Sequence, residues 1–255
     1  MKLPRNPFLH AIRNGKPQIG LWLSLANPFA AEVAAGAGFD WVLIDMEHSP
    51  NDLSSVMAQL QVFAAYPTTP LVRPDWNDQV KVKRLLDAGA PGLLFPMVQS
   101  PEEAAAAVAA ARYPPNGTRG VAGTTRANAF GRVQDYFTRI EDETAILVQA
   151  ETQDALARVD DIAGVKGVDG VFFGPADIAA DMGLLGQPMH DDVWNTILPA
   201  AKRLIAKGVP VGTLVMDPAF ARRLISEGFS FVACGSDVGL LARGSDNLIS
   251  SMREN

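Results

Sequence analysis

Short apolar runs rich in Val, Ile, Leu and Phe alternate along the chain with longer segments in which Ala, Leu and charged residues have helical spacing. Each run is nearly continuously apolar, which is typical of parallel strands covered on both faces. This pattern predicts eight strands, at about 18–24, 40–45, 68–73, 91–97, 144–150, 168–173, 209–215 and 229–234. It predicts helices at about 28–37, 52–65, 77–88, 101–112, 152–163, 191–207, 217–227 and 238–252.

Eight strand–helix units in 255 residues match the length and count of a (β/α)8 TIM barrel. A doubly wound open sheet is the alternative, but no predicted strand is followed by G-x-G-x-x-G, and a Walker phosphate loop is also absent. Four glycines fall between a helix and the next strand, where a left-handed glycine ends a helix: Gly38, Gly89, Gly208 and Gly228. We therefore predict one barrel domain over residues 1–255.

Composition excludes several classes of partner. The chain has 22 basic and 28 acidic side chains, so its formal charge is 22 − 28 = −6, and it has no run of Lys or Arg. Nucleic acid and anionic membranes are therefore not expected partners. The single cysteine, Cys234, cannot form an intrachain disulfide and fits a reducing compartment. There is no signal-peptide pattern and no run of 18 apolar residues, so we expect a cytoplasmic protein.

The residues that end the predicted strands are rich in charge. The second strand ends in Asp45-Met46-Glu47-His48, the third ends at Arg73, and the fifth and sixth end in Gln149-Ala150-Glu151 and Gly174-Pro175-Ala176-Asp177. In a TIM barrel the active site lies at the carboxyl ends of the strands, so we expect these groups to meet on one rim. Such a set of oxygen and imidazole groups is typical of a site for a hard divalent cation.

Two carboxylates on neighbouring strands, Glu151 and Asp177, are the candidate ligands for Mg²⁺ or Mn²⁺, with coordination positions left for substrate and water. The alternative is that each is a solvated rim carboxylate or a helix N-cap. A zinc site of three histidines is disfavoured, because His10 precedes the first strand and His190 lies beside a helix start.

None of the seven lysines ends a predicted strand. Schiff-base chemistry needs a lysine amine at the active face, so a carbanion would have to be stabilised here by a metal ion acting as a Lewis acid.

The chain resembles the HpcH/HpaI class II pyruvate aldolases over nearly its whole length. The resemblance is carried by GLWLSL, IDMEHSPND, LVRPDWND, LLDAGAPGLLFPMVQS, RYPPNGTRGV, LVQAET and GVDGVFFGPADIAADMG, in the order and spacing of the family. It implies reversible, metal-dependent cleavage of a 4-hydroxy-2-oxo acid to pyruvate or hydroxypyruvate and an aldehyde, such as succinate semialdehyde or glyceraldehyde. It also implies a role in aromatic compound catabolism. The alternatives are a 2-dehydro-3-deoxyglucarate-type sugar-acid aldolase, another lyase or decarboxylase that uses the pyruvate enolate, and a non-catalytic oxo-acid-binding protein.

The resemblance also implies a role for individual residues at the oxo-acid end of the site. Glu151 and Asp177 match the ligands of a divalent ion (Mg²⁺, Mn²⁺ or Co²⁺), and Glu47 matches a carboxylate that touches the water shell of that ion. Pyruvate would contact Gln149 and the backbone at Ala176 and Asp177.

The resemblance assigns the remaining site residues as follows. Trp22 would pack near pyruvate, Arg73 would hold the enolate oxygen, and His48 would govern proton transfer. Asp45, together with Asp87 from a neighbouring subunit, would orient and polarise His48. Asp87 also falls in the last turn of a predicted helix, where the helix dipole disfavours a carboxylate, and this suggested a partner outside the helix.

The long stretch 113–143 is the irregular part of the pattern, and we expect a functional loop there. Within it, residues 119–132 are expected to sense the aldehyde, with Arg126 binding a distal carboxylate of the acceptor, as the resemblance suggests. The family also implies a homo-oligomer, a hexamer built as a trimer of dimers. Its last helix, here about 238–252, would be swapped between subunits.

Overall fold

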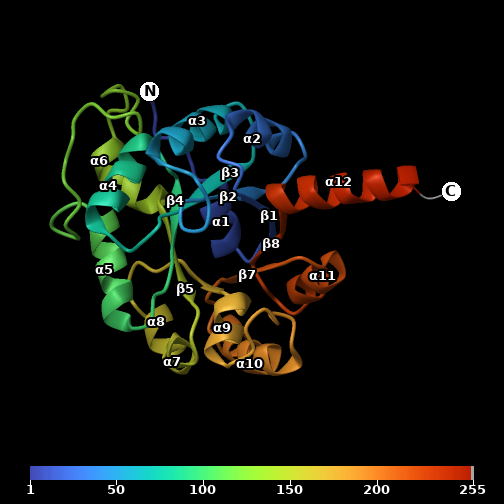
Figure 1. Cartoon of the computed structure of the whole chain (residues 1–255). Coiled ribbons are helices and arrows are strands. Elements are labelled where there is room, and N and C mark those ends of the chain that lie inside the picture. Colours follow the sequence, from blue (N-terminus) through green and yellow to red (C-terminus); the bar gives the residue numbers. More distant parts are fainter. Residues whose placement is uncertain (254–255) are drawn as a thin grey trace.

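Eight parallel strands form a closed barrel in the computed structural model, in the order β1 to β8, with β8 pairing back to β1 (Figure 1). The structure describes residues 1–253. The strands are β1 (Gln18–Leu23), β2 (Trp41–Asp45), β3 (Thr69–Arg73), β4 (Gly92–Phe95), β5 (Ala145–Ala150), β6 (Gly170–Phe173), β7 (Val211–Val215) and β8 (Phe231–Ser236). Each lies within two residues of a predicted run at both ends, so the predicted barrel is confirmed.

Helices connect the strands, and all except α1 and α12 pack around the outside of the barrel. They are α1 (Pro7–Arg13), α2 (Pro28–Ala35), α3 (Leu53–Phe63), α4 (Gln79–Ala88), α5 (Pro101–Ala111), α6 (Tyr136–Glu143), α7 (Gln153–Ala157), α8 (Val159–Ala163), α9 (Pro175–Asp181), α10 (Asp191–Ala206), α11 (Pro218–Ser226) and α12 (Asp237–Arg253).

The helices differ from the predicted helix ranges in four places, one of which is the short helix α9 directly after β6. The helix expected at 152–163 is divided into α7 and α8, because the backbone at Arg158 leaves helical geometry. The stretch 113–143 is not irregular throughout, since it ends in α6, which buries Tyr136. The short helix α1 was not predicted, and it packs Phe8, Leu9 and Ile12 against aromatic side chains inside the barrel.

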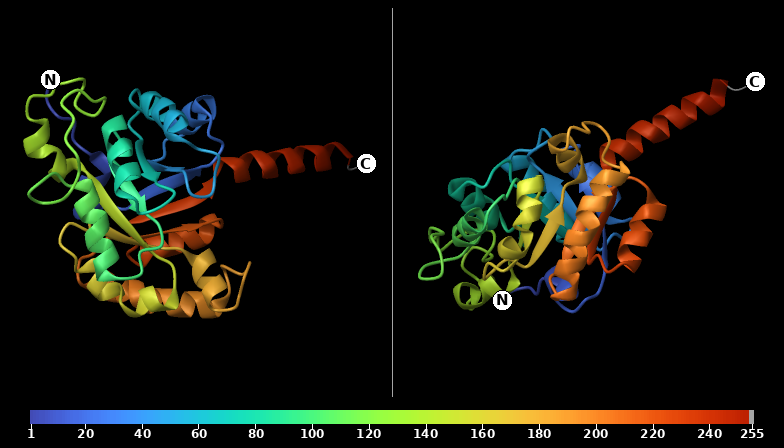
Figure 2. Two further views of the ribbon diagram at one scale, coloured as in Figure 1. Left: turned by 60° about the vertical axis from the view of Figure 1, so that its left-hand side comes forward. Right: turned by 90° about the horizontal axis from the view of Figure 1, so that it is seen from below.

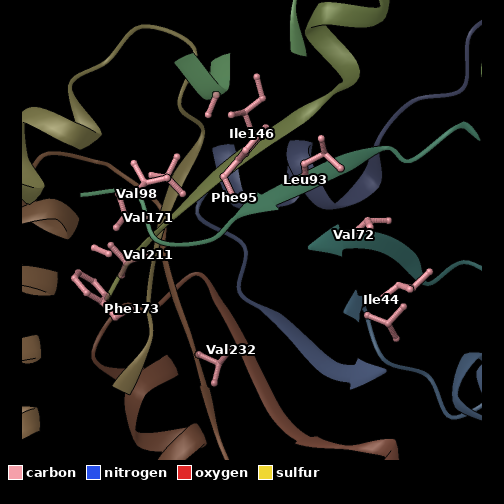
Figure 3. Packing of buried hydrophobic residues seen from close by; sticks show 14 of the residues in the cluster. Ile44, Val72, Leu93, Phe95, Val98, Ile146, Val171, Phe173, Val211 and Val232 are labelled. Carbon is pink, nitrogen blue, oxygen red and sulfur yellow. The ribbon is translucent and has the colours of Figure 1, made fainter. Parts of the chain in front are cut away.

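The alternation of side chains along the strands produces two separate apolar layers. Trp41, Leu43 and their counterparts on the other strands point into the barrel, whereas Val42 and Ile44 pack outward against helices. Figure 3 shows the outer layer, with residues such as Val72 and Phe173 standing between the barrel and its helices. Because the strands are buried on both faces over most of their length, the runs are nearly continuously apolar.

The same alternation places functional side chains above the interior layer. Asp45 continues the inward series of Trp41 and Leu43, and Arg73 continues that of Leu71. On β5 the inward series runs through Leu147 to Gln149 and then to Glu151. The strand register sets Asp45 directly beside Arg73. It also pairs Ala150 with Phe173, so Glu151 and Gly174 follow adjacent strand ends.

The four glycines predicted to end helices all have positive φ angles, between 76° and 103°. At Gly89, whose φ is 97°, the backbone N–H closes the last turn of α4 by bonding to the Leu85 and Leu86 carbonyls. An L-residue would be strained there, so the glycine is required by the turn that returns the chain to the barrel.

The last helix, α12, extends away from the barrel into the surroundings (Figures 1 and 2). It has no buried residue, and its contacts with the domain are mainly to β1 and β8. Its first residue, Asp237, accepts hydrogen bonds from the backbone N–H groups of Ser24 and Leu25 at 2.8 and 3.1 Å. Within residues 1–253, no helix is both long and apolar enough to cross a membrane.

Candidate active site

A cavity of about 480 Å³ lies at the carboxyl ends of the strands. Its lining comes from β1, β3, β5, β6 and β7, and also from the loop after β2, the start of α9 and residues 188–189, so residues far apart in the sequence converge on it. The lining residues are Trp22, His48, Arg73, Gln149, Glu151, Phe172, Gly174, Pro175, Ala176, Asp177, Pro188, Met189, Leu214, Val215, Met216 and Asp217. Seven of the residues singled out from the sequence are therefore brought together in one cavity.

Arg73 and Asp45 form a buried bidentate ion pair beneath this cavity. The guanidinium donates from Nε to Asp45 Oδ1 at 2.8 Å and from Nη2 to Oδ2 at 2.7 Å. The indole of Trp22 donates to Asp45 Oδ2 at 3.3 Å, and its ring centroid lies 5.2 Å from the Arg73 guanidinium carbon. Burial alone would raise the pKa of Asp45, but the hydrogen bonds and charge of Arg73 hold it below its ordinary value. This pair holds Arg73 in a single orientation, with Nη1 left for other partners.

Glu47 is the second carboxylate in contact with Arg73, with its Oε2 2.8 Å from Nη1. Burial raises the pKa of Glu47 above its ordinary value, and the nearby Asp45 and Asp177 carboxylates add to this rise, while Arg73 and His48 oppose it. A carboxylate in these surroundings is stabilised by additional positive charge.

Glu151 is the most deeply placed carboxylate of the cavity. One oxygen accepts from Gln149 Nε2 at 2.6 Å, and the other accepts from the backbone N–H of Met97 at 2.9 Å. Burial raises the pKa of Glu151 to about 7, and Asp177 and Glu47 add to the rise. Met97 has a φ of 51°, so a strained backbone residue directs its N–H toward this carboxylate. The sequence carried no sign of this role for Met97.

Gly174 is required by the position of Glu151. A Cβ at Gly174 would lie 2.4 Å from Glu151 Oε1 and 2.9 Å from its Cγ. The glycine therefore leaves the space that the carboxyl group fills. The next residue, Pro175, begins α9, and Ala176 and Asp177 line the cavity from the first turn of this helix.

These residues are suited to a divalent cation. Asp45, Glu47, Glu151 and Asp177 are four carboxyl groups against the single guanidinium of Arg73, an excess of 4 − 1 = 3 negative charges when all four are ionised. No group of three or more His, Cys, Asp or Glu side chains among residues 1–253 is arranged to hold a metal by itself. Glu151 and Asp177 both line the cavity and could hold such an ion together, with the other positions taken by water and substrate oxygens.

His48 lies at the mouth of the cavity with 67% of its side chain exposed, and its Nε2 is 3.9 Å from Glu47 Oε2. Asp45 was expected to orient the imidazole of His48. Within this chain it accepts from the backbone N–H groups of Glu47 and His48, at 3.0 and 3.5 Å. Both Asp45 oxygens face the buried guanidinium of Arg73.

Two predicted site residues, Asp87 and Arg126, neither line the cavity nor form a hydrogen bond with a residue that lines it. Asp87 was expected to find its partner beyond its helix, and here that partner is Arg119, whose Nη2 donates to Asp87 Oδ1 at 2.7 Å. Arg126 donates to the backbone carbonyls of Ala88 and Leu60, at 2.8 and 3.1 Å. Both residues lie on the side of the barrel formed by α4 and the loop that follows α5.

Sequence reasoning missed the wall that β7 and residues 188–189 contribute. Leu214, Met216 and Asp217 line the cavity there, together with Pro188 and Met189. The rule that active-site residues follow barrel strands identifies Asp217, which stands two residues after β7. The apolar residues carried no signal, since they are indistinguishable from core residues in the sequence.

Comparison with known proteins agrees with this architecture. The profile of the HpcH/HpaI aldolase/citrate lyase family matches residues 18–244. A pyruvate aldolase of Rhizobium etli is 54% identical over 248 residues, covering 97% of this chain and 98% of the relative. A 4-hydroxy-2-oxo-heptane-1,7-dioate aldolase of Salmonella dublin is 50% identical over 245 residues, covering 96% and 93%.

A solved structure gives the same result at the level of the fold. The crystal structure of an HpcH/HpaI aldolase/citrate lyase family protein from Burkholderia cenocepacia has a TM-score of 0.94 and 40% identity. The match covers 98% of this chain and 100% of that one. The expected family and the expected class of carbon–carbon lyase are thus confirmed. The chain belongs to the HpcH/HpaI aldolase/citrate lyase family.

Proposed function

We propose that the protein catalyses reversible, metal-dependent aldol cleavage of 4-hydroxy-2-oxo acids to pyruvate, or hydroxypyruvate, and an aldehyde. One observation carries this proposal: the guanidinium of Arg73 and the carboxylates of Glu151 and Asp177 line one cavity at the carboxyl ends of the strands. Relatives named as aldolases for pyruvate and for 4-hydroxy-2-oxo-heptane-1,7-dioate support it.

Glu151 and Asp177 would hold a divalent ion such as Mg²⁺, Mn²⁺ or Co²⁺, and Glu47 would contact water around it. When bound, the ion supplies a Lewis acid that stabilises negative charge on an oxo acid. Gln149 and the backbone of Ala176 and Asp177 would bind the oxo-acid end. Trp22 is buried, and its indole would pack against the methyl group of pyruvate.

Cleavage removes a proton from the C4 hydroxyl, breaks the C3–C4 bond and releases the aldehyde. The electron pair of that bond becomes the enolate of pyruvate, which is then protonated at C3. Arg73 would stabilise the enolate oxygen. Two unit charges about 4 Å apart at an effective dielectric near 20 interact by about 4 kcal/mol. That energy corresponds to roughly 10³ in rate when it is available only in the transition state.

His48 would transfer the proton, because it brings an imidazole, the side chain that enzymes use most often for proton transfer, to the cavity lining. In a homo-oligomer, Asp87 of a neighbouring subunit would orient this imidazole, which has no hydrogen bond from its ring to a carboxylate within its own described chain. Arg119 would then hold that Asp87 from within its own subunit.

The exposed helix α12 supports a homo-oligomer, in our proposal a hexamer with this helix swapped between subunits. Apolar side chains recur along it at alternating spacings of three and four, interrupted only by Ser245. They are Val238, Leu241, Leu248 and Met252, each between 42% and 76% exposed. Such a stripe is typical of a helix that packs against a partner.

A pyruvate-release assay with and without a chelator tests the proposed function. We expect cleavage of a 4-hydroxy-2-oxo acid to stop when divalent metal is removed and to return when Mg²⁺ or Mn²⁺ is added. Activity that persists after thorough metal removal would exclude the mechanism, as would inactivation by borohydride in the presence of pyruvate, which reports a lysine Schiff base. Release of pyruvate from oxaloacetate alone would favour a decarboxylase.

A further inference from the structure

The wall of the cavity formed by β7 and residues 188–189 is mostly apolar, unlike the rest of the cavity lining. Its side chains are those of Pro188, Met189, Leu214, Val215, Met216 and Asp217. Asp217 is thus the one ionisable group that this wall contributes among the described residues. The positive charge of the cavity comes from β3, which stands four strands away from β7 in the closed barrel.

The position of the oxo-acid end decides what this wall faces. Arg73, Gln149, Glu151 and Asp177 come from the β3, β5 and β6 parts of the rim. An oxo acid bound by them leaves the β7 side of the cavity for the aldehyde-derived half of the substrate. The acceptor aldehyde therefore meets an apolar wall and one carboxylate.

The carboxylate of Asp217 has one oxygen engaged and one free. It is the N-cap of α11, and Oδ1 accepts from the backbone N–H of Ala219 at 2.9 Å. No hydrogen bond or ion pair involves Oδ2 within residues 1–253, and the residue is exposed. A helix of nine residues thus fixes the carboxylate at the edge of the cavity while leaving an acceptor oxygen for a ligand.

We propose that Asp217 is a specificity-determining residue that favours acceptor aldehydes carrying a hydroxyl group over those carrying a distal carboxylate. A hydroxyl can donate to the free Oδ2, whereas a carboxylate meets a like charge with no arginine or lysine on the same wall. This inference rests on the proposed aldolase function, and it identifies the class of its second substrate as a neutral hydroxyaldehyde.

The test compares two acceptors at saturating pyruvate and Mg²⁺: glyceraldehyde, which is a neutral hydroxyaldehyde, and succinate semialdehyde, which carries a distal carboxylate. We expect the wild-type enzyme to have the higher kcat/KM for glyceraldehyde. In Asp217→Asn the ratio of the two kcat/KM values should move by about tenfold toward succinate semialdehyde, because removing the charge removes the repulsion. The KM for pyruvate should stay within about twofold, since the oxo-acid end is untouched.

Two further variants separate charge from helix capping. Asp217→Ser keeps an N-cap oxygen without charge and should move the ratio in the same direction as Asp217→Asn. Asp78→Asn removes the charge of the equivalent N-cap on α4, which does not line the cavity, and should leave the ratio unchanged. Melting temperatures of all three variants report whether each is folded.

The outcomes distinguish this inference from the function on which it rests. If wild-type enzyme cleaves and forms 4-hydroxy-2-oxo acids but Asp217→Asn and Asp217→Ser both leave the acceptor ratio unchanged, Asp217 does not set specificity and the inference is overturned. A wild-type preference for succinate semialdehyde overturns it as well. If the wild-type protein releases no pyruvate from any such acid with metal present, the proposed function itself fails.

Discussion

The carboxyl group of Glu151 contacts the side chain of Gln149 and the backbone N–H of Met97, and only 2% of the residue is exposed. A cation can bind it only in the ionised form, and burial raises its pKa to about 7. The proton and the proposed metal ion would therefore compete for the same group.

Metal affinity should consequently depend on pH. Below about pH 7 the apparent Kd for Mn²⁺ should rise by roughly tenfold per pH unit, because one proton must leave Glu151. Above that pH it should level off. Calorimetric titration between pH 5.5 and 8.5 measures this directly. Glu151→Gln should bind the ion more weakly with a much flatter pH profile. An equally steep profile in that variant would assign the proton to another group.

Gly174 offers a steric test of the same carboxylate. Its backbone φ of −97° is accessible to alanine, so Gly174→Ala would act only through the added methyl group, placed 2.4 Å from Glu151 Oε1. We expect metal affinity and kcat/KM to fall by at least about tenfold as the carboxylate is displaced. Gly123→Ala is the matched control, because nothing lies within 4 Å of its Cβ. Equal effects of the two substitutions would contradict the steric explanation.

His48 tests the proton-transfer step. His48→Ala should lower kcat by about 10²–10³, within the usual range for loss of a general acid or base. Pyruvate should still bind with a Kd within about twofold, because Arg73 and Gln149 remain. Single-turnover kinetics together with pyruvate titration separate the two quantities. The control is His10→Gln, at the other end of the barrel, which keeps a partner for Glu143. Unchanged turnover in His48→Ala would refute the role.

At the level of elements, α12 is the part of the chain that the rest of the domain does not explain. A helix of 17 residues with no buried side chain gains little from its own propensity, so it needs packing from outside the domain. Leu241 and Leu248 lie seven residues apart on the apolar stripe and are 61% and 64% exposed. A partner helix or the barrel of another subunit would bury them.

The oligomeric state tests this interpretation of α12. Leu241→Asp combined with Leu248→Asp should dissociate the assembly to smaller species, because two charges would be buried without partners. Light scattering coupled to size exclusion gives the masses. Ser250→Asp adds a charge on the opposite side of the helix and should leave the mass unchanged. A monomeric wild-type protein would rule out both the swapped helix and the role proposed for Asp87 across subunits.

For the whole molecule, alternation along the strands explains why so much of the site could be predicted. The alternation along a strand also sets the direction of the side chain that ends it, so Asp45 and Arg73 are expected to point inward. Glu151 could be found in the same way. The bidentate contact between Asp45 and Arg73 could not be predicted, because it depends on strand register, which the sequence pattern does not specify.

Other features depend on contacts between segments that are distant in the chain. Met97 acts through its backbone, and Gly174 acts through the space it leaves, so neither role requires a distinctive residue type. Asp217 follows β7, but the chain turns after Val215. The direction of the Asp217 side chain therefore depends on its role as the N-cap of α11. The helix dipole predicted a partner for Asp87 outside its helix, but it could not identify that partner as Arg119 of the same chain.

The free energy of unfolding of the whole protein should depend on pH, because Glu151 is buried without a cation. Its folded pKa of about 7 lies above the ordinary value of 4.5, so the folded state binds this proton more tightly than the unfolded state does. The resulting stabilisation is complete below about pH 4.5 and is lost as the pH rises to about 7. A rise of this size in the pKa of Glu151 corresponds to about 3 kcal/mol in the free energy of unfolding, or roughly 6–12 °C in Tm.

Metal-free wild-type protein should therefore lose stability relative to Glu151→Gln as the pH rises from 4.5 to 8, since the amide does not titrate. Divalent metal should restore the wild type at pH 8 and do much less for the variant, because the cation replaces the proton on the same oxygens. Thermal melts of both proteins, with chelator and with Mn²⁺, provide the four curves. Parallel curves of Tm against pH for the two metal-free proteins would show that Glu151 is already ionised in the folded state well below pH 7. The competition between proton and metal would then have to be assigned to Glu47, because burial also raises the pKa of that carboxyl group.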